Sequence, residues 1–210
     1  MTDPPGIPTH DVSPSSAEFF EAKYVASPSG DPWDFDHSRY EQQRYATLMD
    51  QLGTRRFERA FEPGCSVGAL SRLLALRCVR VLSVDLSTTA IAEAQARARR
   101  AGVTNVEFRA GAFPDVLDAA DGPYDLLCLV EVGYYFDAPS WRTALRRSLR
   151  ATTTPATVLV SHWTGSSSDH ALGAAEVHDI AAEEFDAAGL EPAQKRRHFD
   201  GFIAELWTRS

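Results

Sequence analysis

From residue 57 onward, short apolar runs typical of buried strands alternate with segments in which apolar residues recur every three or four positions. The run at 125–130, DLLCLV, is apolar throughout after its first residue, as expected of a central strand in a parallel sheet. Such an alternation predicts βαβ units and a mostly parallel, Rossmann-like α/β sheet wound on both faces. The strands are expected at 59–62, 81–84, 106–109, 125–130 and 157–161, with helices between them and another at 176–188.

The two ends of the chain add to this pattern. Two strand-like runs flank Asp200-Gly201, a dipeptide that favours a tight hairpin, so the chain is expected to end in a hairpin that adds an antiparallel strand. Near the start, residues 16–26 and 37–52 have the spacing of helices, and six of the twelve prolines fall within the first 32 residues. We therefore predict a mobile tail at 1–15, an N-terminal helical lid at 16–53 and one α/β domain at 54–210.

A glycine turn follows the first strand of the domain and is the strongest indication of a ligand. Gly64 and Gly68 lie four residues apart before a helix, where glycine lets the backbone approach a ligand closely. Asp85 ends the next strand, 21 residues after Gly64, where an acidic side chain suits the two hydroxyls of a ribose. An alternative is that the two glycines only permit tight packing between strand and helix.

The turn departs from the dinucleotide-binding fingerprint, since it has the pattern E-x-G-x-x-x-G instead of G-x-G-x-x-G. The acidic Glu62 would repel a pyrophosphate and would suit a cationic amine. A ligand with ribose and adenosine at one end, and an ammonium and a sulfonium at the other, meets both conditions. The pattern therefore indicates S-adenosylmethionine as the cofactor and disfavours an NAD-dependent oxidoreductase.

On these residues the chain resembles a class I S-adenosylmethionine-dependent methyltransferase over about 57–207. The resemblance implies a seven-stranded sheet ending in an antiparallel hairpin. It also implies that Glu62 serves the methionine amino group, that Gly64 and Gly68 form the cofactor turn, and that Asp85 holds the ribose. Adenine is expected beside Leu86, Ala112 and Phe113. The family often has an acidic residue near position 112, and this sequence has none there.

More narrowly, the chain is similar to the nodulation N-methyltransferase (NodS-like) group. Three segments carry this resemblance: Asp31-Pro32-Trp33, then Glu131-Val132-Gly133-Tyr134-Tyr135, then His162-Trp163 followed by Asp169, Gly173 and Val177-His178. Enzymes of this group methylate small acceptors, notably amino sugars, and related sequences act on sugar hydroxyls. The resemblance implies a sugar or amino sugar as acceptor, and leaves open whether nitrogen or oxygen is methylated.

Two ionisable residues follow strands at the edge where open α/β sheets bind ligands: Glu131 after the fourth strand and His162 after the fifth. In methyl transfer the thioether leaving group needs no proton, whereas the acceptor must be neutral or must lose one. His162 is the preferred general base because its ordinary pKa is near 6.5, and its alternative is a hydrogen bond to a loop. Glu131 could bind the methionine ammonium, hold an acceptor ammonium or cap a turn.

Several further residues are expected near the ligands. Trp33 is assigned to the cofactor, and the acceptor is expected to contact Tyr24, Tyr134, Tyr135 and Trp163, because aromatic faces stack on sugars, attract cations and exclude water. Core packing is the alternative for each of these aromatic residues.

Asp169 and His178 are included as substrate residues mainly on the resemblance. The spacing of His162, Asp169, His170 and His178 matches no ligand motif, so no metal is expected.

Charge and composition narrow the remaining functions. The 29 acidic residues outnumber the 21 basic ones, giving a net charge of −8, which argues against nucleic acid or an anionic membrane as the partner. The first sixteen residues lack the apolar stretch of a secretory signal, so the cytoplasm is expected. The alternatives are a nucleic-acid methyltransferase, a cofactor-binding module without activity, and an O-methyltransferase of a metabolite other than a sugar. The oligomeric state is left open.

Overall fold

The computed structural model describes residues 16–117 and 121–210, which form a seven-stranded sheet with helices on both faces. The strand order is β3-β2-β1-β4-β5-β7-β6. Strands β1 to β5 pair in parallel, and β7 runs antiparallel to both β5 and β6. The strands are β1 Phe57–Pro63, β2 Cys78–Asp85, β3 Val106–Ala110, β4 Tyr124–Val130, β5 Thr152–Trp163, β6 Glu191–His198 and β7 Phe202–Arg209.

The helices begin where the sequence offers a side-chain cap. Ser16, Ser38, Ser87 and Asp137 each accept a hydrogen bond from a backbone N–H of the first helical turn, which satisfies a donor that the helix itself leaves unpaired. The helical elements are α1 Ala17–Ala26, α2 Arg39–Leu52, α3 Ala69–Leu74, α4 Thr88–Arg100, the 3₁₀ turn η1 Gly133–Tyr135, α5 Ala138–Arg150 and α6 Ala174–Ala187.

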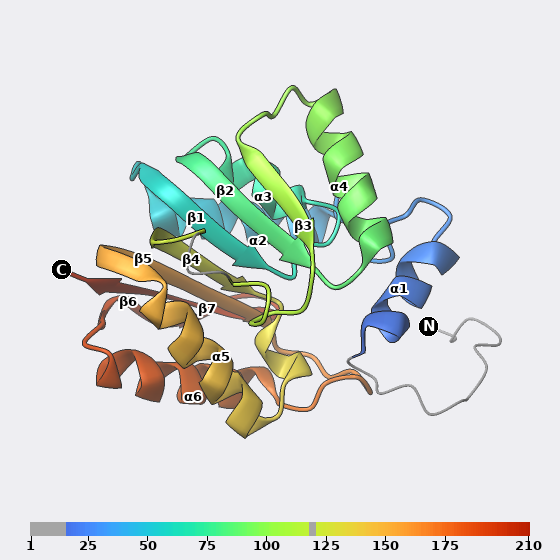
Figure 1. Ribbon diagram of the computed structural model, residues 1–210. Coiled ribbons are helices and arrows are strands. Elements are labelled where there is room, and N and C mark those ends of the chain that lie inside the picture. Colours follow the sequence, from blue (N-terminus) through green and yellow to red (C-terminus); the bar gives the residue numbers. More distant parts are fainter. Residues whose placement is uncertain (1–15, 118–120) are drawn as a thin grey trace.

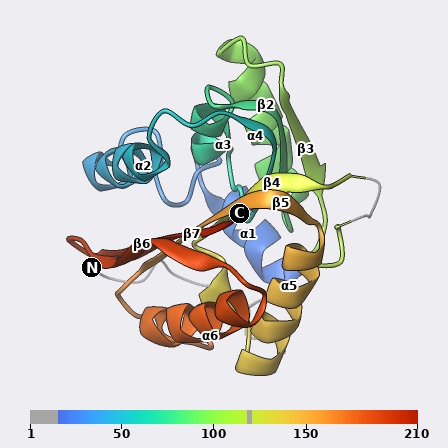
Figure 2. The same ribbon diagram turned by 90° about the vertical axis from the view of Figure 1, so that its left-hand side faces the viewer.

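Two hydrophobic layers hold the helices against the sheet, because successive strand residues point to opposite faces. On one face Leu127 and Val158 pack with Trp141 of α5 and Phe185 of α6. On the other face, α2 and α3 pack on residues such as Leu126 and Leu159, and α4 lies on the same side (Figure 2). Helix α1 lies apart from both layers, beside the carboxyl ends of the parallel strands (Figure 1).

The sequence prediction of the fold class is confirmed, including the terminal hairpin with its antiparallel strand, and the structure places β7 next to β5. Strand β5 is longer than the 157–161 expected, since it begins at Thr152 and ends at Trp163. Strand β6 carries charged residues and is largely exposed, as is usual at a sheet edge. The predicted tail at 1–15 lies outside the described residues. No described helix is long and apolar enough to cross a membrane.

The glycine at position 68 should be needed for packing as well as for backbone conformation. Its φ is +74°, and a Cβ there would lie 2.9 Å from Cε1 of Phe108 and 3.1 Å from Cβ of Ala94. Gly102 has a similar φ of +68° with nothing within 4 Å of a Cβ. We expect Gly102→Ala to lower the free energy of unfolding by about 1–2 kcal/mol, and Gly68→Ala by about 1–3 kcal/mol more. Urea unfolding measures both, and equal losses would contradict the packing argument.

Candidate active site

A cavity of about 260 Å³ opens at the carboxyl ends of β1, β2 and β4, where open α/β sheets bind ligands. It brings together ten of the residues predicted from the sequence to contact cofactor or acceptor: Tyr24, Trp33, Gly64, Asp85, Leu86, Ala112, Phe113, Glu131, Tyr134 and Tyr135. The other predicted site residues do not line it: Glu62, Gly68, His162, Trp163, Asp169 and His178.

The floor of the cavity is built around Asp85, at the end of β2. Its carboxylate accepts the backbone N–H of Ser66 at 2.9 Å and that of Ser87 at 3.0 Å. Burial raises the pKa of Asp85 to about 6. A carboxylate offers about four acceptor positions, so these bonds leave capacity to accept from a ligand hydroxyl. Leu86, Ala112 and Phe113 also line the cavity and offer an apolar surface for a flat ring.

The acidic residue of the glycine turn, Glu62, is buried next to this floor. One oxygen, Oε2, accepts hydrogen bonds from the hydroxyls of Ser71 at 2.6 Å and Ser83 at 2.7 Å. Burial raises the pKa of Glu62 to about 7. The structure therefore pairs Glu62 with two serines, and its side chain does not line the cavity.

Glu131 lies in the cavity wall and makes hydrogen bonds or an ion pair with three other residues. It follows β4 with a left-handed φ of +56°, which is uncommon for a residue with a side chain and concentrates at functional sites. Its Oε2 accepts the Tyr134 hydroxyl at 2.5 Å, and its Oε1 accepts the backbone N–H of Trp163 at 2.8 Å. Burial raises the pKa of Glu131 even though the neighbouring Arg44 acts to lower it.

Arg44 and Glu41, on α2, are site residues that sequence reasoning missed. The Arg44 guanidinium is 2% exposed, makes an ion pair with Oε1 of Glu131 and bonds Glu41 at 2.5 Å. Both side chains line the cavity. A signal was present, because positions 41 and 44 share the helical spacing of the buried residues Tyr45 and Leu48. A charged pair in that stripe indicates a buried partner.

His162 lies at the end of β5, as predicted, but its ring lies outside the cavity. It is fully buried, and its Nε2 accepts the backbone N–H of Gly133 at 2.9 Å. Its Nδ1 lies 3.3 Å from Nε2 of His178, which is itself bonded to Glu205. Burial holds the pKa of His162 well below its ordinary value. This arrangement gives no direct support to the prediction that His162 is a general base.

The remaining predicted residues lie at the edge of the site. Tyr24 donates its hydroxyl to Ser66 at 2.6 Å, and Trp163 is 36% exposed outside the cavity. Asp169 is buried and accepts Lys23 of α1 at 2.8 Å, which ties that helix to the loop after β5. Across the parts of the chain that the structure describes, no group of three or more His, Cys, Asp or Glu side chains is placed to hold a metal ion.

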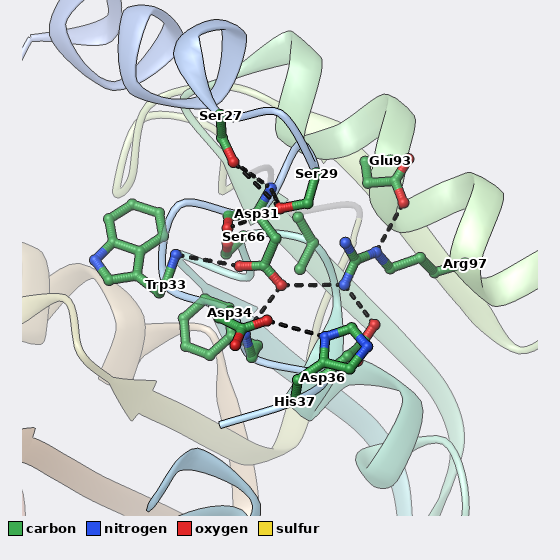
Figure 3. Close-up of polar contacts among 12 residues, drawn as sticks. Ser27, Ser29, Asp31, Trp33, Asp34, Asp36, His37, Ser66, Glu93 and Arg97 are labelled. Carbon is green, nitrogen blue, oxygen red and sulfur yellow. Dashed lines mark hydrogen bonds and ion pairs between the residues drawn. The ribbon is translucent and has the colours of Figure 1, made fainter. Parts of the chain in front are cut away.

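The loop between α1 and α2 closes over the cavity and is fixed by charged contacts (Figure 3). Asp31 accepts the backbone N–H groups of Trp33 at 3.3 Å and Phe35 at 3.0 Å, which shapes the turn. Arg97 of α4 bonds both Asp31 at 3.1 Å and Asp36 at 2.5 Å. The segment that carries Trp33 is therefore attached to the helix that follows β2.

The strand order, together with a cavity at the switch between β1 and β4, defines the fold of class I S-adenosylmethionine-dependent methyltransferases. Within that class, the chain belongs to the nodulation protein S (NodS) family, whose sequence profile matches residues 23–195. The resemblance stated from the three sequence segments is thereby confirmed.

Individual relatives agree with this assignment. Nodulation protein S of Azorhizobium caulinodans is 31% identical over 137 residues, which cover 64% of this chain and 62% of that protein. That of Bradyrhizobium diazoefficiens is 32% identical over 120 residues, covering 55% and 54%. The matched part thus spans between about half and three fifths of these curated relatives.

Solved structures extend the likeness over more of the chain. The N-methyltransferase NodS of Bradyrhizobium japonicum WM9, solved with S-adenosyl-L-homocysteine, superposes with a TM-score of 0.77 at 21% identity, covering 92% of this chain and 98% of that one. A protein of Pseudomonas syringae, described as a methyltransferase, gives a TM-score of 0.69 at 30% identity, covering 82% and 100%.

The buried Glu62 makes stability depend on pH in a predictable direction. Its pKa is about 7 in the folded chain against an ordinary 4.5, so the folded state binds more protons between these values and stability falls as pH rises through them. Gln can accept the same two serine hydroxyls and does not titrate. Glu62→Gln should therefore flatten the fall in unfolding free energy between pH 5 and pH 8, leaving the part due to Asp85. An unchanged slope in urea unfolding at several pH values would contradict this.

Proposed function

We propose that this protein is an S-adenosylmethionine-dependent methyltransferase that acts on a small-molecule acceptor. One observation carries the proposal: the cavity combines a cofactor-type floor around Asp85 with an ionisable wall at Glu131. The NodS family membership supports the same class of reaction. A cofactor-binding module without activity would need the floor and would have no use for the buried charges of the wall.

The residues of the floor fit S-adenosylmethionine. The free acceptor positions of Asp85 suit the ribose hydroxyls, and the wall formed by Leu86, Ala112 and Phe113 suits adenine. Gly64, with φ of +69°, lines the cavity at the turn, where glycine lets the backbone approach a ligand closely. When bound, the cofactor supplies an electrophilic methyl group on a sulfonium. Glu62 would act on the methionine ammonium at longer range, through its charge or through water.

The wall favours an acceptor that is cationic or neutral. Asp85, Glu41 and Glu131 line the cavity against the one arginine, Arg44, so the charged lining is net negative. An anionic acceptor would be repelled. We assign Glu131 to the acceptor, since a partly buried carboxylate with a raised pKa can hold an ammonium or take a proton from an amine or hydroxyl.

An amino sugar or a sugar is the acceptor class that we favour. The support is the family membership, together with aromatic side chains on the cavity wall, among them Trp33 and Tyr135. Aromatic faces stack on sugar rings and attract cations. Methylation at nitrogen and at oxygen both fit this wall, and O-methylation of a metabolite other than a sugar is the alternative.

We also propose that residues 16–53 act as a lid. Helix α1 supplies Phe20 and Tyr24, the loop supplies Trp33 and Phe35, and α2 supplies Arg44 to the cavity. These side chains form one side of the cavity, so a movement of the segment would change the access of ligands to it. Such closure would exclude water from the methyl group and commit the acceptor.

The assignment of Asp85 to the ribose has a matched control within the fold. Asp125 of β4 likewise accepts two backbone N–H groups, those of Glu58 and Arg59, both at 2.8 Å, and does not line the cavity. Asp85→Asn should weaken binding of S-adenosylmethionine by about 1–3 kcal/mol, as expected when ligand hydroxyls lose a charged partner. Asp125→Asn should alter stability and leave affinity unchanged. Calorimetry measures both, and equal affinities would remove Asp85 from the cofactor site.

The lid can be tested at its attachment to α4. Arg97 bonds Asp31 and Asp36, whereas Arg100, four-fifths of a turn away, forms an ion pair with Glu93 and with no other residue that the structure describes. Arg97→Met should speed amide hydrogen exchange in the loop at 27–38, and Arg100→Met should not. Cofactor should slow exchange there in the wild type. Protection by cofactor confined to the glycine turn would argue against a lid.

The proposed activity is tested by incubating the protein with S-adenosylmethionine and a panel of acceptors, with mass spectrometry as the readout. Amino sugars, sugar glycosides, amines and phenols should be compared side by side. We expect a product heavier by one methylene group for an amino sugar or a sugar. Cofactor binding without transfer to any acceptor would favour the module without activity, and tight binding of NAD in place of S-adenosylmethionine would overturn the site assignment.

A further inference from the structure

A line of buried polar side chains runs behind the cavity wall and is not used by the proposed chemistry. It begins at His162 of β5, continues through His178 of α6 and ends at Glu205 of β7, which are 0%, 1% and 4% exposed. Burying three titratable groups side by side is unfavourable unless each is hydrogen-bonded. Here each one is.

The direction of the hydrogen bonds follows from one fixed donor. The backbone N–H of Gly133 points at Nε2 of His162 at 2.9 Å, so that nitrogen must be unprotonated. The proton of the neutral ring is then on Nδ1 and is donated to Nε2 of His178 at 3.3 Å. His178 in turn donates from Nδ1 to Oε1 of Glu205 at 2.7 Å. The three side chains are thus held in one set of tautomers.

The far end of the line is fixed by further donors. Arg196 donates from Nε to Oε1 of Glu205 at 2.7 Å, and Trp207 donates from Nε1 to its Oε2 at 3.0 Å. Arg196 is held at the same time by Asp179 at 2.7 Å. These partners keep Glu205 ionised and oriented, so the line has a rigid base in β6, β7 and α6.

The near end of the line determines where the turn η1 lies. A Cβ at Gly133 would be 2.4 Å from Cγ1 of Val177 and 3.0 Å from Nε2 of His162, so the turn is pressed against the ring. The next residue, Tyr134, donates its hydroxyl to Glu131, and both line the cavity. A shift of the His162 ring would therefore move the carboxylate that we assign to the acceptor.

We propose that His162, oriented by His178 and Glu205, is a positioning residue that anchors the turn η1 through Gly133 and so sets the place of Tyr134 and Glu131. The consequence for acceptor turnover rests on the proposed function, whereas the anchoring itself does not. His162 takes no proton from the acceptor in this account, because its only unprotonated nitrogen faces the backbone of the turn.

Two substitutions at one position separate the possible roles. The amide oxygen of Gln can reach the place of Nε2 and accept the Gly133 N–H, so His162→Gln keeps the anchor without a titrating group. Leu has no acceptor, so His162→Leu loses the anchor at similar volume. Amide hydrogen exchange at Gly133 reports the anchor directly, calorimetry reports cofactor affinity, and kcat and KM for the acceptor are measured per folded enzyme.

Positioning predicts a split between the two variants. His162→Gln should keep Gly133 protected and keep most of the turnover, whereas His162→Leu should lose the protection and roughly 10–10²-fold of kcat/KM for the acceptor. Cofactor affinity should hold in both. Loss of turnover in His162→Gln with Gly133 still protected would make His162 the general base. Full turnover in His162→Leu with Gly133 unprotected would make the contact purely structural. Either result overturns the proposal.

A second pair of variants covers the case in which His162→Leu does not fold. His178→Leu removes the acceptor of the His162 Nδ1 proton, and His178→Gln can retain it. Faster exchange at Gly133 in the first variant and not in the second is the expected result. Equal exchange in both overturns the proposal. This readout needs no acceptor. A wild-type protein without methyl transfer would therefore refute the proposed function, and hydrogen exchange at Gly133 would still test the anchoring role of His162.

Discussion

The ion pair between the buried Arg44 of α2 and the partly buried Glu131 after β4 joins the N-terminal segment to the carboxyl-end edge of the sheet. Removing one partner of such a pair typically costs about 3–5 kcal/mol, because the other charge is left buried and alone. Glu41 adds a second carboxylate to the same guanidinium. The pair therefore holds α2 over the cavity, and the charge on Arg44 opposes the rise in the pKa of Glu131 that burial causes.

The cavity carries more negative charge than its protein surroundings neutralise. Burial raises the pKa of Asp85 to about 6 and that of Glu62 to about 7, and it also raises the pKa of Glu131. Ionisation of these three carboxylates is therefore less favourable in the folded protein than in water. A cation nearby would lower that cost, since an opposite charge favours the ionised form. S-adenosylmethionine brings such charges, which is why these carboxylates suit it better than they suit a pyrophosphate.

The sequence was a good guide wherever periodicity or chain position decided the outcome. Asp85 and Glu131 could be placed because strand ends meet at one edge of the sheet. His162 could be placed at that edge as well, but the side to which its ring points could not. Successive strand residues point to opposite faces of the sheet, and the ring of His162 lies on the α5–α6 side with Val158 and Val160. Arg44 was missed because its partner, Glu131, lies far away in the chain. The roles of Glu62 and Gly68 depended on side-chain packing that no local pattern reports.

The central claim is that ionised Glu131 acts on the acceptor, and Glu41 provides the matched control because it shares Arg44. The measurement is kcat/KM for the acceptor, with cofactor affinity measured separately, in Glu131→Gln and Glu41→Gln. We expect Glu131→Gln to lose roughly 10²-fold or more of kcat/KM at nearly unchanged cofactor affinity, the range for loss of a positioned base, and Glu41→Gln to lose much less. Turnover close to the wild type in Glu131→Gln, or a loss explained wholly by weaker cofactor binding, would contradict it.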